Sequence, residues 1–93
     1  MARSRQARVH VHAINLEKIG RRIRELRGFD MTQVEFARRI DVAQSHLSGL
    51  ERGEKEPCAG VLIAISLEFG TSVDWLLTGE NGPRRKKAAP NKS

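Results

Sequence analysis

Apolar residues recur at helical spacing along the chain, in stretches separated by Gly, Pro, Asp or capping residues. The first stretch has apolar positions three or four residues apart, namely Leu16, Ile19, Ile23 and Leu26. This spacing places the side chains on one face of an α-helix. We therefore predict a helix over about residues 15–27. It begins at Asn15, whose side chain can cap a free N–H group of the first turn, and it ends at Gly28.

Two shorter patterns follow between Thr32 and Gly53. The first begins at Thr32, and Glu35 lies at the spacing that completes a reciprocal capping box. Asp41 comes next, at a sharp turn that needs a left-handed backbone, a conformation that Asp tolerates better than most residues. The second pattern predicts a helix over about residues 44–51. The two helices and their short joint outline a helix-turn-helix.

The helix over residues 44–51 is expected to bury Leu47 and Leu50 and to expose a polar face. That face consists of Gln44, Ser45, Ser48 and Gly49. Polar side chains of this kind suit contact with a nucleic acid better than packing in a core. Ala43 occupies the N-cap, where Ser or Thr is usual, and the loss amounts to about 1 kcal/mol.

Pro57 indicates the approach of a fourth helix, which has Cys58 at its cap and is predicted to continue to Phe69 before Gly70 ends it. Its expected core residues are Ala59, Leu62, Ile65 and Phe69. Val61, Ile63 and Leu67 are then surplus, because a surface helix needs an apolar stripe only about 100° wide. The surplus is covered either within the chain or by another subunit.

Ser72 is expected to cap a short fifth helix that contains Val73, Trp75, Leu76 and Leu77. Between the first and second helices, Phe29 or Met31 is expected to fill the core. The chain is thus predicted to be all-α, with five helices in one domain, since 93 residues hold only one small core.

The chain resembles the lambda-repressor-like family, also called the Cro or XRE type, from Leu16 to about Gly79. The matching string is TQ…FA…I…V…Q…L…LERG…P, followed by SVDWLLTGE. The resemblance implies a compact five-helix DNA-binding domain with the helix-turn-helix at its second and third helices. It also implies an ion pair between Arg27 and Glu51. The loop from Gly28 to Met31 is one residue shorter than the commonest family pattern, which affects the angle between the first two helices.

The resemblance further implies a dimer built from the last two helices. The expected interface residues are Val61, Leu67, Val73, Trp75 and Leu77. A dimer suits the task, because one short recognition helix reads too few bases, whereas two read a palindrome whose half-sites lie about 34 Å apart. The alternative is that Trp75 and the surplus aliphatic residues complete the core of a monomer.

The positive charge lies at the two ends of the chain. The net charge is +6, yet residues 13–82 hold nine basic and eleven acidic side chains. We therefore divide the chain into a basic arm (1–12), the DNA-binding domain (13–79) and a flexible basic tail (80–93). Arg3, Arg5 and Arg8 of the arm are candidates for contact with a minor groove or with phosphates. The tail either attracts DNA at long range or only keeps the protein soluble.

Candidate contacts within the domain follow from side-chain chemistry. Gln44 can pair bidentately with the N6 and N7 edge of adenine. Ser45 and Ser48 can each form one hydrogen bond to a base with little selectivity, and Gly49 is expected to make no base contact. The expected phosphate contacts are Gln33, His46, Arg52 and Lys55. The position of Gln33 has this role in the family.

Other classes of function find little support. His10, His12, His46 and Cys58 lack the spacing of a zinc site, so we expect no metal and no cofactor. No nucleophile motif or phosphate-binding loop is present, so we expect no enzyme. No run of 18 apolar residues could span a membrane. A single cysteine cannot form an internal disulfide and fits a reducing cytoplasm.

The sequence therefore predicts a dimeric, sequence-specific regulator of transcription that binds a palindromic operator in double-stranded DNA, most simply as a repressor. One alternative is an antitoxin, which would bind a toxin as its protein partner and regulate its own operon. Another is the controller protein of a restriction-modification system, which can also activate. General nucleic-acid binding, including association with RNA, would show affinity that ignores sequence.

Overall fold

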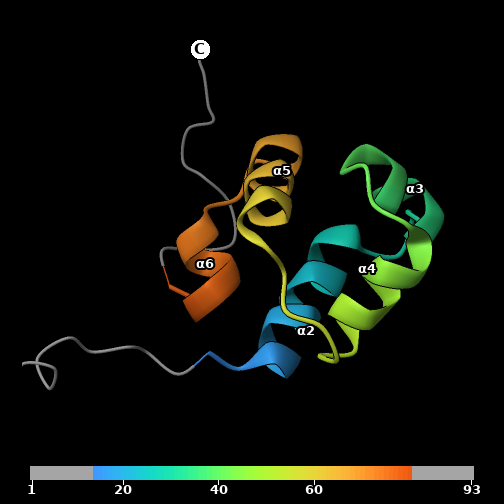
Figure 1. Cartoon of the computed structure of the whole chain (residues 1–93). Helices are drawn as coiled ribbons and strands as arrows, with labels where there is room; N and C mark the ends of the chain where they lie inside the picture. The colour runs from blue at the N-terminus through green and yellow to red at the C-terminus, as the bar shows by residue number, and fades with distance from the viewer. Residues whose placement is uncertain (1–13, 81–93) are drawn as a thin grey trace, which may run out of the picture.

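A computed structural model of the protein describes residues 14–80, which form five helices and no strand (Figure 1). The helices are α2 (Leu16–Arg27), α3 (Gln33–Arg39), α4 (Gln44–Glu51), α5 (Ala59–Phe69) and α6 (Val73–Thr78). The all-α architecture predicted from the sequence is thus confirmed. The expected arm at 1–12 and nearly all of the expected tail lie outside the described residues.

The helix boundaries follow from local capping chemistry. The Asn15 side chain accepts a hydrogen bond from the Lys18 N–H, and the Ser72 side chain accepts one from the Trp75 N–H. Thr32 and Glu35 form both halves of the predicted capping box. Ala43 and Cys58 provide no side-chain cap, so α4 and α5 depend on packing for their stability.

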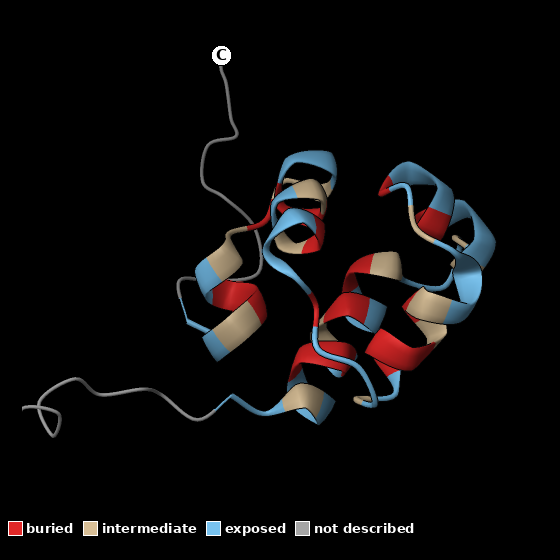
Figure 2. Cartoon of the chain, in the orientation of Figure 1, coloured by how far each residue is buried: buried red, intermediate tan, exposed pale blue. Residues whose placement is uncertain are grey.

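One apolar core joins the five helices (Figure 2). Each helix contributes to it. The fully buried apolar residues are Ile19, Ile23, Phe36, Leu47, Leu50, Ile65 and Leu76. The rings of Phe36 and Phe69 stack with their centroids 4.3 Å apart, which joins α3 to α5. This core holds α3 and α4 in a fixed relative orientation.

The prediction for the core side of α5 was wrong at two positions. Ala59 is exposed and Val61 is buried, although the reverse was expected. The helix is apolar on nearly every side, so its spacing did not identify which side faces the core. In the loop before α3, Met31 packs against the core, whereas Phe29 is fully exposed.

Candidate nucleic-acid interface

The turn between α3 and α4 fixes the geometry of the site. Asp41 has φ 60°, the left-handed conformation predicted for it. The Val42 N–H donates to the Ala37 carbonyl at 3.0 Å and the Asp41 N–H donates to the Arg38 carbonyl at 3.2 Å. These bonds use carbonyls that the end of a helix leaves free, so the turn is closed by the backbone itself.

The outer face of α4 carries three of the expected contact residues. Gln44 and Ser45 are exposed and Ser48 is half-buried. Leu47 and Leu50 anchor the opposite face in the core. Gly49 was expected to face outward without cover, but it is buried. An ideal Cβ on Gly49 would lie 2.9 Å from the Cδ and Cε atoms of Lys55, so the stem of that lysine covers the glycine.

A buried carboxylate organises the polar side of the helix-turn-helix. The side chain of Glu51 is only 1% exposed. Arg27 donates to it bidentately, from Nε to Oε2 and from Nη2 to Oε1, each at 2.8 Å. Arg27 also donates from Nη1 to the Met31 carbonyl at 3.2 Å. The ion pair implied by the family resemblance is present, and it joins α2, the following loop and α4.

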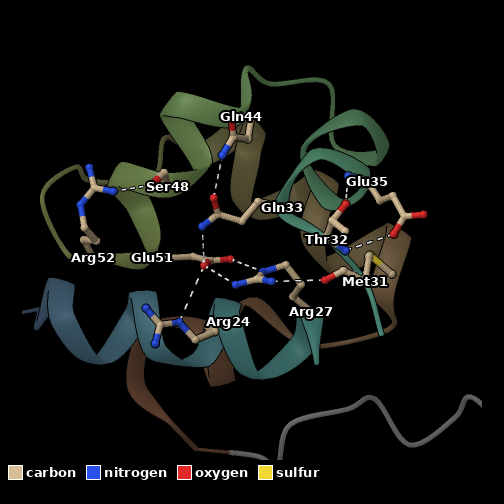
Figure 3. A network of polar contacts seen from close by, with 10 residues as sticks. All are labelled: Arg24, Arg27, Met31, Thr32, Gln33, Glu35, Gln44, Ser48, Glu51 and Arg52. Carbon is tan, nitrogen blue, oxygen red and sulfur yellow. Dashed lines mark hydrogen bonds and ion pairs between the residues drawn. The ribbon is translucent and has the colours of Figure 1, made fainter. Parts of the chain in front are cut away.

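The same carboxylate continues into a chain of amides (Figure 3). Gln33 Nε2 donates to Glu51 Oε1 at 2.9 Å, and Gln44 Nε2 donates to Gln33 Oε1 at 2.8 Å. Gln44, at the exposed start of α4, is therefore oriented by Gln33, which is itself held by a buried charge. The separate roles expected for these two glutamines did not include the bond between them.

The electrostatics of the pair agree with its geometry. The hydrogen bond to Glu51 raises the pKa of Arg27 above its ordinary value, against the opposing effect of burial. Arg24 lies nearby, with its Nε 3.8 Å from Glu51 Oε1. A buried carboxylate is tolerated only when its charge is paired and its lone pairs are used, and Glu51 meets both conditions.

Arg52, at the end of α4, is held by two neighbours. It donates from Nη1 to Ser48 Oγ, and from Nε and Nη2 to the two carboxylate oxygens of Glu54 at 3.0 and 2.9 Å. These bonds raise the pKa of Arg52 and lower that of Glu54. Three of the five guanidinium donors are used, so one N–H remains on each terminal nitrogen.

The other predicted contact residues divide into three groups. His46 is half-buried on α4. Of the expected dimer residues, Leu67 is exposed, Val73 and Leu77 are half-buried, and Val61 and Trp75 are buried in the core of the single chain. Arg3, Arg5 and Arg8 lie outside the described residues.

Among residues 14–80, no group of three or more His, Cys, Asp or Glu side chains is arranged to hold a metal ion. Within the same residues, no helix has both the length and the apolar character that crossing a bilayer requires.

Five helices with a helix-turn-helix at α3 and α4 define a domain of the helix-turn-helix class. The helix-turn-helix family model matches residues 21–76. The chain belongs to this family, in its lambda-repressor-like (Cro or XRE) group of DNA-binding transcription regulators. A search of the curated proteins gave no match.

Three solved structures illustrate the likeness. The P22 c2 repressor, in complex with a synthetic operator, is 33% identical, with a TM-score of 0.63, over 67% of this chain and 96% of its own. The restriction-modification controller protein C.AhdI from Aeromonas hydrophila is 25% identical, with a TM-score of 0.61 and the same two coverages. The clp gene regulator ClgR from Corynebacterium glutamicum is 30% identical, with a TM-score of 0.59, over 70% of this chain and 86% of its own.

Proposed function

We propose that the protein binds a specific sequence of double-stranded DNA by placing α4 in the major groove, with Gln44 pairing to an adenine. The observation that carries this proposal is the chain of hydrogen bonds from buried Glu51 through Gln33 to Gln44. After donating to Gln33, the Gln44 carboxamide retains one N–H and its carbonyl oxygen. Adenine offers the matching pair, an N7 acceptor and an N6 donor.

The surroundings of α4 supply the contacts that position the protein on the backbone. Gln33 keeps a second N–H on Nε2, and Arg52 keeps two donors, so both can bind phosphate oxygens without breaking the bonds described above. His46, Lys55 and the arginines of the arm are further phosphate or minor-groove candidates, and Ser45 and Ser48 can add single hydrogen bonds to bases.

We infer further that the protein acts as a dimer on a palindromic operator and represses transcription by blocking the promoter. Ile63 and Leu67, four residues apart on α5, are 54% and 70% exposed. Such a pair is costly to leave in water and suits the interface of a second copy. Two copies of α4 would then read two half-sites about one helical turn of DNA apart.

Selection of bound sites from randomised DNA tests the proposal directly. We expect an enriched site made of two related half-sites, and recovery of random sequence would refute specific binding. Gln44→Ala should lose about tenfold or more in affinity for the selected site and far less for random DNA. Ser45→Ala, which removes a neighbouring exposed side chain with a single weakly selective bond, is the matched control and should lose much less.

The likeness to C.AhdI favours one second candidate, the controller of a restriction-modification system. Both candidates use the same DNA-binding face, and they differ in the effect on transcription. In a reporter assay with the selected site placed at a promoter, a repressor only lowers transcription. A controller also raises transcription from a promoter placed downstream of the site.

A further inference from the structure

Gly49 is unusual because it is buried although it lies on the outer face of α4. It follows Ser45 by four residues, so the two occupy the same side of the helix, one turn apart. Ser45 is exposed there, whereas Gly49 is covered by the Cγ, Cδ and Cε atoms of Lys55. An ideal Cβ at position 49 would lie 2.9–3.0 Å from all three atoms, which is too close.

The path of the loop after α4 places the lysine there. The Glu54 N–H donates to the Gly49 carbonyl at 2.9 Å, which folds the loop back along the helix and sets Lys55 beside it. The aliphatic part of the Lys55 side chain thus covers Gly49, the one position of the outer face that has no side chain. The Lys55 ammonium, one bond beyond Cε, therefore lies close to that face.

We propose that Gly49 and Lys55 form one recognition unit, in which Gly49 provides the groove and the Lys55 ammonium donates to O6 and N7 of a guanine in each half-site. This inference rests on the proposed function and adds a second read base to the adenine paired with Gln44. The ammonium has only donors, and guanine is the base that presents two adjacent acceptors in the major groove. The alternative role for Lys55 is a phosphate contact, which would have no base preference.

The first test compares the wild-type protein with Lys55→Ala on the selected operator and on every single base-pair substitution of one half-site. The wild type should lose about tenfold at one guanine, and also when that guanine is replaced by 7-deazaguanine, which lacks the N7 acceptor. Lys55→Ala should bind the operator and these variants equally at that position, while keeping its preference for the adenine read by Gln44.

Lys18→Ala is the matched control, because Lys18 and Lys55 are the two lysines among residues 14–80 and both are exposed. It removes the same charge and should keep the guanine preference. Lys55→Ala could instead lose affinity equally for all sequences, with the slope of log affinity against log salt concentration reduced by about one. That result would identify a phosphate contact and overturn the proposal. So would a guanine preference lost equally by Lys18→Ala.

The second test is Gly49→Ala, alone and combined with Lys55→Ala. The added methyl group displaces the flexible lysine stem, so the single variant should lose the guanine preference while its thermal midpoint stays at or above that of the wild type. The double variant should bind no more weakly than Lys55→Ala. A Gly49→Ala protein that keeps the guanine preference would refute the joint role of Gly49 and Lys55.

The site selected by the wild-type protein separates the two proposals. If the wild type selects no sequence at all, the proposed function itself fails. If it selects a site without this guanine, only the inference about Gly49 and Lys55 fails.

Discussion

Glu51 shows how one residue can serve stability and orientation together. Its carboxylate accepts two hydrogen bonds from Arg27 and one from Gln33, so a charge taken out of water is fully paired. The same oxygens set the direction of the Gln33 amide and, through it, that of Gln44. The ion pair was expected from the family pattern. The amide chain was not, because it depends on side-chain directions that spacing along the sequence does not fix.

Replacing Glu51 by Ala should lower the free energy of unfolding by about 3–5 kcal/mol, because Arg27 would be left partly buried without its partner. Urea unfolding followed by circular dichroism measures this change. Glu54→Ala is the matched control, since Glu54 is an exposed glutamate near the same helix end, and its stability should barely change. Equal stability of the two variants would contradict the assigned role of Glu51.

Glu54 itself should weaken DNA binding, because its negative charge offsets that of Arg52 and repels a phosphate bound to the two donors that Arg52 keeps. Glu54→Gln should therefore raise operator affinity a few-fold, as measured by fluorescence anisotropy at low salt. The control combines Glu54→Gln with Arg52→Ala, and this double variant should show no gain in affinity over Arg52→Ala alone. A gain that persists would show that Glu54 does not act through Arg52.

The pH dependence of the Arg52–Glu54 pair follows from the same contact. Arg52 lowers the pKa of Glu54, so the pair is intact above the ordinary range of a glutamate and is lost only as the pH falls through this lowered pKa. Titration of Glu54 should consequently leave DNA binding unchanged between pH 6 and pH 8.

At the scale of elements, the contact between α2 and α4 depends on a glycine. An ideal Cβ on Gly20 would lie 2.4 Å from the Leu50 carbonyl oxygen and 2.5 Å from that of Glu51. Both atoms belong to the backbone of α4, which cannot rotate away as a side chain can. Gly20 therefore allows the two helices to approach closely enough for Arg27 to reach Glu51.

Gly20→Ala should destabilise the protein by about 1–3 kcal/mol, because α2 must move away from α4. Gly60→Ala is the matched control: Gly60 is also helical, but its nearest neighbour to an added Cβ is Cys58 Sγ at 4.0 Å. That variant should gain up to about 1 kcal/mol from the higher helix propensity of Ala. Thermal unfolding of the two proteins compares them directly, and a Gly20→Ala midpoint at or above the wild-type value would show that the contact is not tight.

At this scale, the sequence predicted the features that depend on neighbouring residues and missed those that depend on distant ones. The caps at Asn15, Thr32 and Ser72 and the left-handed turn at Asp41 involve neighbouring residues, and all four were predicted. The buried side of α5 was not, because Ala59 and Val61 are both apolar and only the surrounding helices decide which of them is covered. The cover of Gly49 by Lys55 was missed for a similar reason, since it arises from the path of a loop.

At the scale of the whole molecule, the excess of basic residues and the helix-turn-helix lie in different parts of the chain. Residues 13–82 carry two more acidic than basic side chains, whereas residues 1–12 and 83–93 hold eight basic residues and no acidic one. We therefore propose that the helix-turn-helix binds DNA through a few well-placed donors, among them Gln33, Gln44 and Arg52. We propose that long-range attraction to a polyanion comes from the basic ends of the chain.

The burial of the expected interface residues limits the surfaces through which the protein could form a dimer. Val61 and Trp75, expected at the interface, are enclosed by their own chain and offer little surface. Ile63 and Leu67 offer much more, and half-buried Val73 and Leu77 of α6 are the other expected interface residues that retain some exposed surface. A dimer of this chain is therefore expected to form through the outer side of α5.

Leu67→Glu should convert such a dimer into a monomer, because the interface would have to bury an unpaired carboxylate. Sedimentation equilibrium measures the mass of the protein in solution. Operator binding should weaken at least tenfold and become more dependent on protein concentration, since two separate monomers must then assemble on one site.

Phe29→Glu is the control, an equally charged replacement at a fully exposed apolar residue outside α5, and it should remain a dimer. Phe29→Glu should keep the wild-type stability to urea, because Phe29 does not belong to the core, and Leu67→Glu should lose only the stability that dimerisation adds. A Leu67→Glu protein that stays dimeric would move the interface to another face, and a monomeric wild type that binds its operator with full affinity would remove it altogether.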